Sequence, residues 1–526
     1  MSHMFDAEEE PNLDKQIETH KRRLAALAVQ GSRKNDLAPV SRLSEELLSA
    51  IISYVKWFPE MRYRKIVKMP QFWMCALVSK RWHQVVISTP YLWNMVNANW
   101  TSGKIKTWLA RSRTTGLYIW MDGALKDQDS RAIPKLISTE HYRIRSLRII
   151  TSAALMDDWR QVLNHDAPMM EVFSLYITYP QQHDHDCRLN LTFPASYFHG
   201  RPPPLLQKFE FGGPHIVWTS PHLCNLTCLR IQGHRRSNRP HVPLAQVLRS
   251  LRHLPLLKYL DIAEEAFPDD DDNPQNLVVK VSRLKLLRFR GGFERWCPLL
   301  THLVLPFATE IDLCSTSRGL SEVDILFNHL AVHFGSANQQ DKFDSVAMHQ
   351  NEDGLRLRAE CTRSTGRPPL HIDFKSTKQR EDMYVKFAAI DPVSRATRLC
   401  LTGLAPTFVQ WKGIERAMAF LEVLRLGGEA CGSFPGDILR INEYAWPFMR
   451  LVRIEIEKAP LRTLTAGMGD FWEIMGRSAV AILGGQMVGR WWGERLRDVE
   501  FVACDGGVDA GFVRLLEDRG IEVGIA

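Results

Sequence analysis

Residues 254–263 read LPLLKYLDIA, and apolar residues at Leu257, Leu260 and Ile262 give this stretch the pattern L-x-x-L-x-L. Alternate residues of a strand face opposite sides, so the pattern predicts a short strand whose last two apolar residues point into a core. With related apolar residues accepted, the pattern recurs at Ile144/Leu147/Ile149, Val172/Leu175/Ile177, Leu206/Phe209/Phe211, Leu226/Leu229/Ile231, Leu284/Leu287/Phe289, Leu300/Leu303/Leu305, Ala396/Leu399/Leu401, Leu421/Leu424/Leu426, Leu451/Ile454/Ile456 and Leu496/Val499/Phe501. The sequence therefore predicts a repeated strand unit.

Helix-like segments separate these strands. Residues 242–254, for example, carry leucines at helical spacing between prolines. Successive copies begin mostly 16 to 34 residues apart, which overlaps the period of about 20 to 29 residues of leucine-rich repeats. The array resembles an irregular leucine-rich-repeat-like domain over residues 101–526, and the resemblance implies a curved α/β solenoid with one parallel sheet. The polar residues 335–354 predict a loop or insertion there, and with it a seam.

Two further stretches predict helices near the N-terminus. Residues 37–55 read LAPVSRLSEELLSAIISYV, and residues 75–93 read CALVSKRWHQVVISTPYLW. Ser44 before Glu45 and Glu46 is typical of a helix start, because a serine caps free amides and acidic residues meet the positive end of the helix dipole. Each stretch then carries one apolar stripe, formed by Leu47, Leu48, Ile51, Ile52 and Val55 in the first and by Cys75, Val78, Trp82, Val85 and Val86 in the second. A helical module this small tends to gain stability from a partner or a neighbouring domain.

The order and spacing of these residues resemble an F-box, in particular that of the large fungal (basidiomycete-type) F-box families. The resemblance is carried by Pro39, Leu43, Glu46-Leu47-Leu48, Ile51, Leu77-Val78-Ser79-Lys80-Arg81-Trp82, Pro90 and Trp93. Two positions depart from the family, since Ser44 stands where proline is usual and Ser79 where cysteine is usual. The expected fold class is α/β, with an N-terminal tail and helix over residues 1–36, a helical F-box-like domain over 37–100 and the leucine-rich-repeat-like solenoid after it. Residues 12–30 supply the helix that precedes the box in these families.

The resemblance implies a function in recruitment. An F-box docks on a Skp-family adaptor, which links it to a cullin-RING ubiquitin ligase of the SCF type, and the repeats then hold an unknown target protein. The residues expected to bind the adaptor are Pro39, Leu43, Leu47, Leu48, Ile51, Ile52, Leu77, Val78, Trp82, Leu92 and Trp93. The alternative is an F-box and repeat protein that acts as an interaction scaffold outside any ligase.

The outward face of the predicted sheet is the candidate surface for the target protein. Arg230, Arg288, Arg290 and His302 fall on four successive predicted strands, which predicts a positive stripe for an acidic or phosphorylated partner. A merely solvated face is the alternative, and the acidic run Asp269 to Asp272 offers a loop that neutralises the stripe. The residues expected to bind the target are Arg230, Tyr259, Arg288, Arg290, His302 and Arg425.

The sequence carries no motif of an enzyme site. It has no G-x-x-x-x-G-K, G-x-S-x-G or H-E-x-x-H, so we expect a protein that is not an enzyme, with no catalytic residues and no cofactor. The run His183-Asp184-His185-Asp186-Cys187 contains ligand types for zinc or copper. Adjacent residues rarely converge on one ion, so a solvated loop is the favoured interpretation and no metal site is predicted.

Composition and charge limit the remaining classes. The chain has 526 residues with 45% hydrophobic and 24% charged residues, and no apolar stretch reaches the length of a membrane span. Ten cysteines without a C-x-x-C pair, and an acidic polar N-terminus, indicate an intracellular protein of the cytoplasm or nucleus. The net charge of +8 raises nucleic-acid binding. The densest basic and aromatic stretch, residues 62–73, lies inside the F-box-like region, so an enlarged loop is the simpler interpretation.

Overall fold

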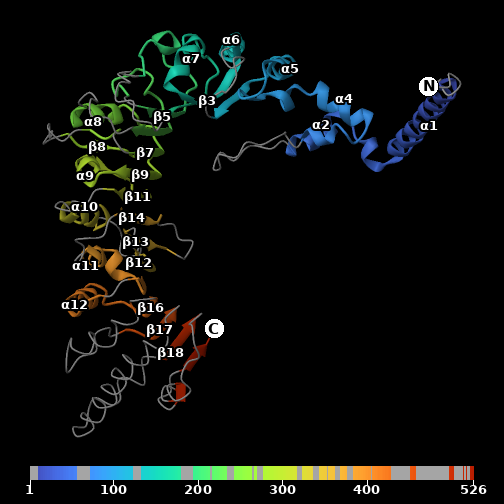
Figure 1. Cartoon of the computed structure of the whole chain (residues 1–526). Coiled ribbons are helices and arrows are strands. Elements are labelled where there is room, and N and C mark those ends of the chain that lie inside the picture. Colours follow the sequence, from blue (N-terminus) through green and yellow to red (C-terminus); the bar gives the residue numbers. More distant parts are fainter. Residues whose placement is uncertain are drawn as a thin grey trace, which may run out of the picture. The chain divides into compact units, whose positions relative to one another are not determined.

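Figure 1 shows a computed structural model of the chain, coloured from blue at the N-terminus to red at the C-terminus. The structure describes residues 10–55, 72–122, 132–178, 193–213, 216–233, 242–263, 266–268, 277–316, 323–335, 343–351, 354–361, 368–375, 383–403, 406–427, 430, 450–457, 497–502, 513–514, 517 and 522–525. The chain divides into two compact units. Unit 1 is Met1–His183 with Ser196–Leu205, and unit 2 is Asp184–Ala195 with Leu206–Ala526. These units cut the chain at other points than the predicted domain ranges, which stay predictions.

Unit 1 begins with helical elements. They are α1 (Glu10–Leu37), the 3-10 turn η1 (Pro39–Arg42), α2 (Glu45–Tyr54), α3 (Phe72–Cys75), α4 (Lys80–Ser88) and the 3-10 turn η2 (Pro90–Trp93). Serine caps start two of them, because Ser44 Oγ accepts a hydrogen bond from the Leu47 amide at 3.3 Å and Ser79 Oγ accepts one from the Trp82 amide at 3.3 Å. Such a cap contributes about 1 kcal/mol. The two positions that depart from the F-box pattern therefore serve as helix caps.

The rest of unit 1 is a parallel sheet with helices between its strands. The strands are β1 (Met95–Asn97), β2 (Leu117–Asp122), β3 (Ile144–Ser152) and β4 (Val172–Thr178), paired in that order. The helices are α5 (Ser102–Ser112), α6 (Ala132–Ser138) and α7 (Met156–Leu163), with 3-10 turns η4 (His141–Arg143), η5 (Ala153–Leu155) and η6 (Tyr197–Gly200). The strands predicted around residues 147 and 175 are both present.

A buried arginine ties α5 to the start of β3. Arg143 is 2% exposed and pairs with Glu140 at 2.7 Å. Its guanidinium donates to Ser112 Oγ at 3.0 Å and to the carbonyls of Thr115 and Leu109 at 2.9 and 3.2 Å. Carbonyls at a helix end lack partners inside the helix, so this side chain supplies them and stabilises the junction.

Unit 2 continues the same alternation. Its parallel strands are β5 (Lys208–Gly213), β6 (Cys228–Gly233), β7 (Tyr259–Ala263), β9 (Leu286–Gly291), β11 (Glu310–Ser315), β15 (Arg398–Thr402), β16 (Val423–Gly427), β17 (Arg453–Glu457), β18 (Asp498–Val502) and β19 (Glu522–Ile525). Its helical elements are α8 (Leu244–Arg252), α9 (Phe293–Thr301), α10 (Val323–Gly335), α11 (Met383–Ala388), the 3-10 turn η8 (Val393–Arg395) and α12 (Phe408–Ala417). Figure 1 shows α8 to α12 along one side of these strands. Predicted inward residues whose burial the structure describes are buried, among them Leu260, Ile262 and Phe289.

Three strands interrupt the parallel order of unit 2. They are β12 (Ser345–Asn351), β13 (Gly354–Glu360) and β14 (Leu370–Lys375), and β13 is antiparallel to both of the others. They lie in the order β11, β14, β13, β12, β15 across the sheet. The prediction of a loop over residues 335–354 is wrong for β12, where Val346 and Met348 are fully buried. Strand β12 pairs with β13 on one side and with β15 on the other, and these partners stabilise a strand whose own sequence is mostly polar.

The copy predicted at Leu300/Leu303/Leu305 is not a strand of the large sheet. Leu300 belongs to α9, and β10 (Leu303–Val304) pairs with β8 (Val279–Lys280) in a separate two-stranded ribbon. The place next to β9 is taken by β11, which was not among the predicted copies. His302 therefore lies at the end of α9 rather than on a strand.

The predicted mixed α/β architecture is confirmed, with its N-terminal helix and a large sheet in which parallel pairing dominates. Among the described residues, no helix combines the length and apolar character needed to cross a bilayer. Predictions that concern residues 62–71, 183–187 and 269–272 lie outside the described residues.

Candidate functional site

Exposed apolar side chains gather on α2 and on the segment that begins with α3. Leu47 on α2 is 56% exposed and Leu77, just after α3, is 69% exposed. We call the following set the apolar surface: Leu47, Ile51, Tyr54, Met74, Leu77 and Val78. Helices α2 and α3 pack on each other, so the set comes from neighbouring elements. Exposed apolar residues on neighbouring elements are typical of interaction sites, because leaving apolar area in water costs free energy that a partner recovers.

Helix α2 divides its apolar residues between two faces. Leu48 and Ile52 are fully buried, whereas Leu47 and Ile51, one position before each, are exposed. The buried pair belongs to the interface with α4, whose Val85 is 1% exposed. One helix therefore serves both the internal core and the outer surface.

Polar contacts hold α4 against the segment that leads into α2. The guanidinium of Arg81 donates to the backbone carbonyls of Ser41 and Leu43. At the other end of α4, Thr89 Oγ1 donates to Ser49 Oγ at 3.2 Å. Hydrogen bonds from a charged donor to carbonyls are stronger than neutral ones. The position of the apolar surface is thus fixed by contacts behind it.

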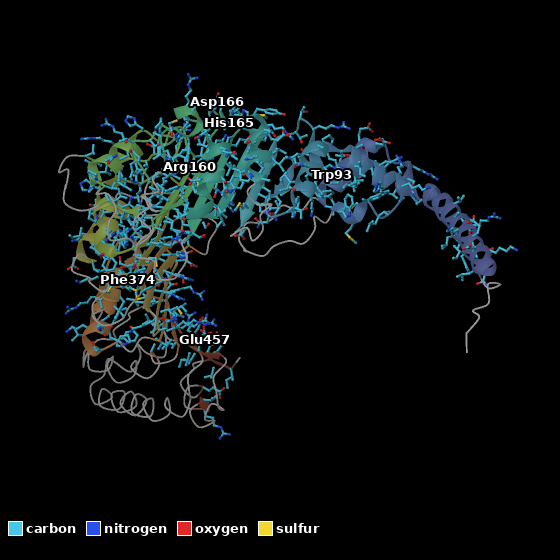
Figure 2. All side chains as sticks on the ribbon, turned by 45° about the horizontal axis from the view of Figure 1, so that its top comes forward. Trp93, Arg160, His165, Asp166, Phe374 and Glu457 are labelled. Carbon is cyan, nitrogen blue, oxygen red and sulfur yellow. The ribbon has the colours of Figure 1, made fainter. Side chains whose placement is uncertain are left out.

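Trp93 anchors this helical segment to α5. Its indole Nε1 donates to the Val86 carbonyl at 2.8 Å, and its ring meets Trp73 and Trp108 edge-on, with centroid distances of 5.6 and 4.6 Å. The guanidinium of Arg111 lies 4.3 Å from the ring centroid, in a cation–π arrangement. Figure 2 labels Trp93 among the side chains of the helical elements. The Trp93 side chain therefore makes all of these contacts within the protein and has no surface exposed to solvent.

The structure separates the residues predicted to bind an adaptor into two groups. Leu48, Ile52, Leu92 and Trp93 have no exposed surface, because packing inside the protein covers them. Adaptor binding by these four residues stays a prediction. The remaining residues are exposed or partly exposed: Pro39, Leu43, Leu47, Ile51, Leu77, Val78 and Trp82. Whether these seven bind an adaptor stays a prediction.

Two residues of the apolar surface were missing from the predicted site. Tyr54, 91% exposed, lies three residues after Ile51 on the same helix face, and that spacing was a usable signal. Met74 lies on α3, a single turn of helix. No periodic pattern is long enough to be recognised over four residues, so no sequence signal pointed to Met74.

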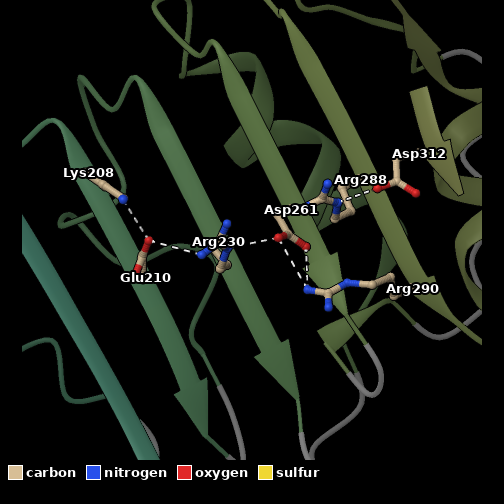
Figure 3. Close-up of polar contacts among 7 residues, drawn as sticks. All are labelled: Lys208, Glu210, Arg230, Asp261, Arg288, Arg290 and Asp312. Carbon is tan, nitrogen blue, oxygen red and sulfur yellow. Dashed lines mark hydrogen bonds and ion pairs between the residues drawn. The ribbon is translucent and has the colours of Figure 1, made fainter. Parts of the chain in front are cut away.

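The predicted basic stripe on the sheet of unit 2 is wrong, because carboxylates alternate with the arginines. Glu210, Arg230, Asp261, Arg288 and Asp312 occupy matched positions on β5, β6, β7, β9 and β11. Arg230 reaches Asp261 at 2.9 Å and Glu210 at 3.4 Å, and Arg288 reaches Asp312 at 2.6 Å. Figure 3 shows these pairs across the strands. We call this row the charge ladder.

Flanking residues complete the ladder. Lys208 Nζ lies 3.0 Å from Glu210, and Arg290 Nη2 lies 3.0 Å from Asp261. The Glu210 side chain is fully buried and that of Asp261 is 7% exposed. A buried carboxylate requires charge compensation, which the arginines supply from both sides. The positive charges of the arginines are thus neutralised by carboxylates on the strands of the same sheet.

The other residues predicted to bind a target, which are Tyr259, His302 and Arg425, are not members of this row. Tyr259 is 43% exposed on β7. Arg425 on β16 pairs with Glu457 at 2.8 Å and with Glu455 at 3.9 Å, in a second group of ion pairs that spans β16 to β18. His302 is not on the sheet face, because its Nδ1 lies 2.8 Å from the Pro298 carbonyl at the end of α9. Target binding by these residues stays a prediction.

Thiols on the same face are poor nucleophiles. Burial raises the pKa of Cys228, Cys314 and Cys400, so the reactive thiolate form is disfavoured at neutral pH. Within the described segments, no group of three or more histidine, cysteine or carboxylate side chains is arranged to hold a metal ion. The charged residues on this face of the sheet therefore form a fixed polar surface that is suited to binding.

Comparison with known proteins gives no independent identification: no family model matches the chain, and no curated protein matches it either. The interpretation of the apolar surface and of the charge ladder therefore depends on the geometry of this structure alone.

Proposed function

We propose that this protein is the substrate-recognition subunit of a cullin-RING ubiquitin ligase of the SCF type. In this proposal the F-box-like segment docks on a Skp-family adaptor, and the leucine-rich-repeat-like solenoid binds a target protein. Ubiquitin transfer would follow from proximity, because the assembly raises the effective concentration of target lysines beside a conjugating enzyme.

The division of α2 into two faces supports the proposal most. Leu47 and Ile51 remain in water while Leu48 and Ile52 form the core. A helix that had only to fold would not need the second apolar face. Full burial of such a side chain contributes about 1.5 to 3 kcal/mol, and Leu47 and Ile51 forgo part of this because they are about half exposed. The exposed face also coincides with positions that resemble an F-box, which links this geometry to an adaptor.

The sheet face of unit 2 supports the second half of the proposal. Its outward residues are held in rows by strand register, one from each strand, and the ladder fixes their charges in alternation. Paired charges at fixed positions favour a partner with a complementary pattern of both signs over one that is simply acidic. Tyr259, exposed within this face, is the aromatic residue best placed to anchor such a partner.

Adaptor docking is tested by placing charge on the apolar surface. We expect Leu47→Asp and Leu77→Asp each to weaken binding to a purified Skp-family adaptor by tenfold or more, because an unpaired carboxylate in an apolar interface costs about 2 kcal/mol or more. Titration calorimetry of the full chain measures the loss. Val409→Asp is the matched control, since Val409 is 72% exposed on α12 and belongs to unit 2, whereas the apolar surface belongs to unit 1.

The outcomes are distinguishable. Loss of binding in Leu47→Asp and Leu77→Asp with full binding in Val409→Asp supports docking through the apolar surface. A wild-type chain that does not bind the adaptor contradicts the proposal outright. A chain that binds the adaptor but never brings a cullin with it from cell extract is an interaction scaffold outside the ligase.

A further inference from the structure

Helix α1 exposes every side chain that the structure describes between residues 13 and 31. Leu13, Ile17, Leu24 and Leu27 are the large apolar residues of one face, and each is between 42 and 67% exposed. Most helical stability in proteins comes from packing an apolar face, because the intrinsic stability of an isolated helix in water is marginal. Within the described part of the chain, nothing covers this face. We therefore expect a binding partner to cover this face and to stabilise α1.

The spacing of these residues indicates what kind of partner fits. Leu13, Ile17, Leu24 and Leu27 are four, seven and three residues apart, and His20 occupies the place between Ile17 and Leu24. Alternating steps of four and three give a mean period of 3.5 residues, which is the heptad of a coiled coil. We call these five residues the α1 stripe. A heptad stripe is complementary to another helix of the same kind.

The charges beside the stripe are complementary to a second copy in one direction only. Asp14 and Lys21 directly follow Leu13 and His20, so both lie on the same flank of the stripe. In an antiparallel pair of helices, the flank that carries Asp14 and Lys21 faces the same flank of the other copy. Asp14 of each copy then lies beside Lys21 of the other. In a parallel pair, this flank faces the opposite flank of the other copy, where Lys21 lies beside the uncharged Gln16.

We propose that the α1 stripe is a self-association surface, on which α1 of a second copy packs in the antiparallel direction. The interface is two-fold symmetric, with Leu13 of one copy beside Leu24 of the other and Ile17 beside His20. The stripe and its flanking charges come from α1 alone, so this association does not depend on adaptor binding. His20 is polar in an otherwise apolar seam, and such a residue lowers affinity while it fixes the register.

Sedimentation of the full chain tests the association. We expect a dimer whose fraction rises with protein concentration. Leu24→Ser should raise the dissociation constant about tenfold or more, because it removes an apolar contact at two symmetric places. Val29→Ser is the matched control, since Val29 is 54% exposed on the opposite side of α1. His20→Leu should tighten the dimer.

Charge exchange tests the direction. Asp14→Lys and Lys21→Glu should each weaken the dimer about tenfold, because each places like charges opposite one another twice. An equimolar mixture of the two variants should regain dimer, since the mixed pair has opposite charges at both places. Lys15→Glu, a charge reversal away from the stripe, should leave the dimer unchanged.

Three results would overturn the inference. The chain stays monomeric at every concentration reached, or Leu24→Ser sediments like Val29→Ser, or the mixture of Asp14→Lys and Lys21→Glu dimerises no better than either variant alone. The last result excludes the antiparallel arrangement even where a dimer exists.

Discussion

Asp261 is the residue on which the arginines of two neighbouring strands converge. Arg230 and Arg290 both reach its carboxylate, whose side chain is 7% exposed. Asp261→Asn keeps the shape but removes the charge, and the arginines lose their shared counter-ion. We expect a loss of about 1 to 2 kcal/mol in the free energy of unfolding, a modest value because both arginines are partly screened by solvent. Chemical denaturation measures this loss.

The control for Asp261→Asn is Glu422→Gln, at an exposed position just before β16. It should change stability by less than about 0.5 kcal/mol. Equal denaturation midpoints for the two variants would mean that the ladder contributes nothing.

His165 lies in a group of three histidines in unit 1, and Figure 2 labels it beside Asp166. Its ring stacks on His141 at 4.6 Å and meets His199 at 6.3 Å. Burial, followed by the charges of His141 and His199, lowers the pKa of His165, and Asp166 opposes this shift. As the pH falls, the unfolded chain takes up a proton at this residue before the folded one does. Stability linked to His165 is therefore present above the ordinary histidine pKa of about 6.5 and is lost as the pH falls below it.

We expect His165→Gln to reduce the loss of stability between about pH 7 and pH 5. Thermal unfolding at several pH values measures the slope. Val29→Ser, which changes no titratable group, should leave the slope unchanged. Identical slopes for wild type and His165→Gln would show that the histidine group is not linked to folding.

Single residues also mark the limit of prediction from sequence. Leu47 and Leu48 are adjacent members of one apolar stripe, and the stripe is wide enough to serve a core or a partner. Only the position of α4 decides that Leu48 is buried and Leu47 exposed. Likewise, Arg230 is basic in the sequence, and its pairing with Asp261 requires the register of β6 on β7. Helix spacing and strand pattern were predictable, whereas the surroundings of each side chain depended on neighbouring elements.

At the scale of elements, strands rich in leucine were predictable and polar ones were not. Strands β6, β7 and β9 lie where the repeated pattern placed them. Strand β11 was missed although Ala308, Ile311 and Leu313 have the same spacing as the predicted copy Ala396/Leu399/Leu401. Polar strands such as β12 are held by pairing on both sides, which no local pattern records.

The antiparallel pair of β13 and β14 depends on a glycine. A Cβ atom added at Gly354, the first residue of β13, would lie 2.1 Å from the Phe374 carbonyl oxygen of β14. The neighbour is backbone and must shift, so we expect Gly354→Ala to cost about 1 to 3 kcal/mol in unfolding experiments. Gly103→Ala is the control, because a Cβ there meets nothing within 4 Å in α5.

Gly103→Ala should stabilise the protein by about 0.5 to 1 kcal/mol, because alanine loses less backbone entropy in a helix. If the two variants shift stability in the same direction, the approach of Gly354 to the Phe374 carbonyl is looser than its geometry indicates.

At the scale of the whole molecule, the two proposed binding activities lie on different parts of the chain. The apolar surface belongs to unit 1 and the charge ladder to unit 2. A subunit that recruits a target must hold the adaptor and the target at once, so separate surfaces are what the proposed function requires. Changes to one surface are expected to leave binding at the other intact.

Hydrogen exchange of the full chain with and without a purified Skp-family adaptor tests the central claim most directly. The account predicts that a complex forms and that amides of residues 45–55 and 72–78 gain protection, while β5 to β11 are unchanged. Burial of α2 and α3 under a partner reduces their local opening, which is what exchange reports. Failure to form a complex, or protection confined to the sheet of unit 2, would contradict the assignment of the apolar surface as the adaptor-binding site.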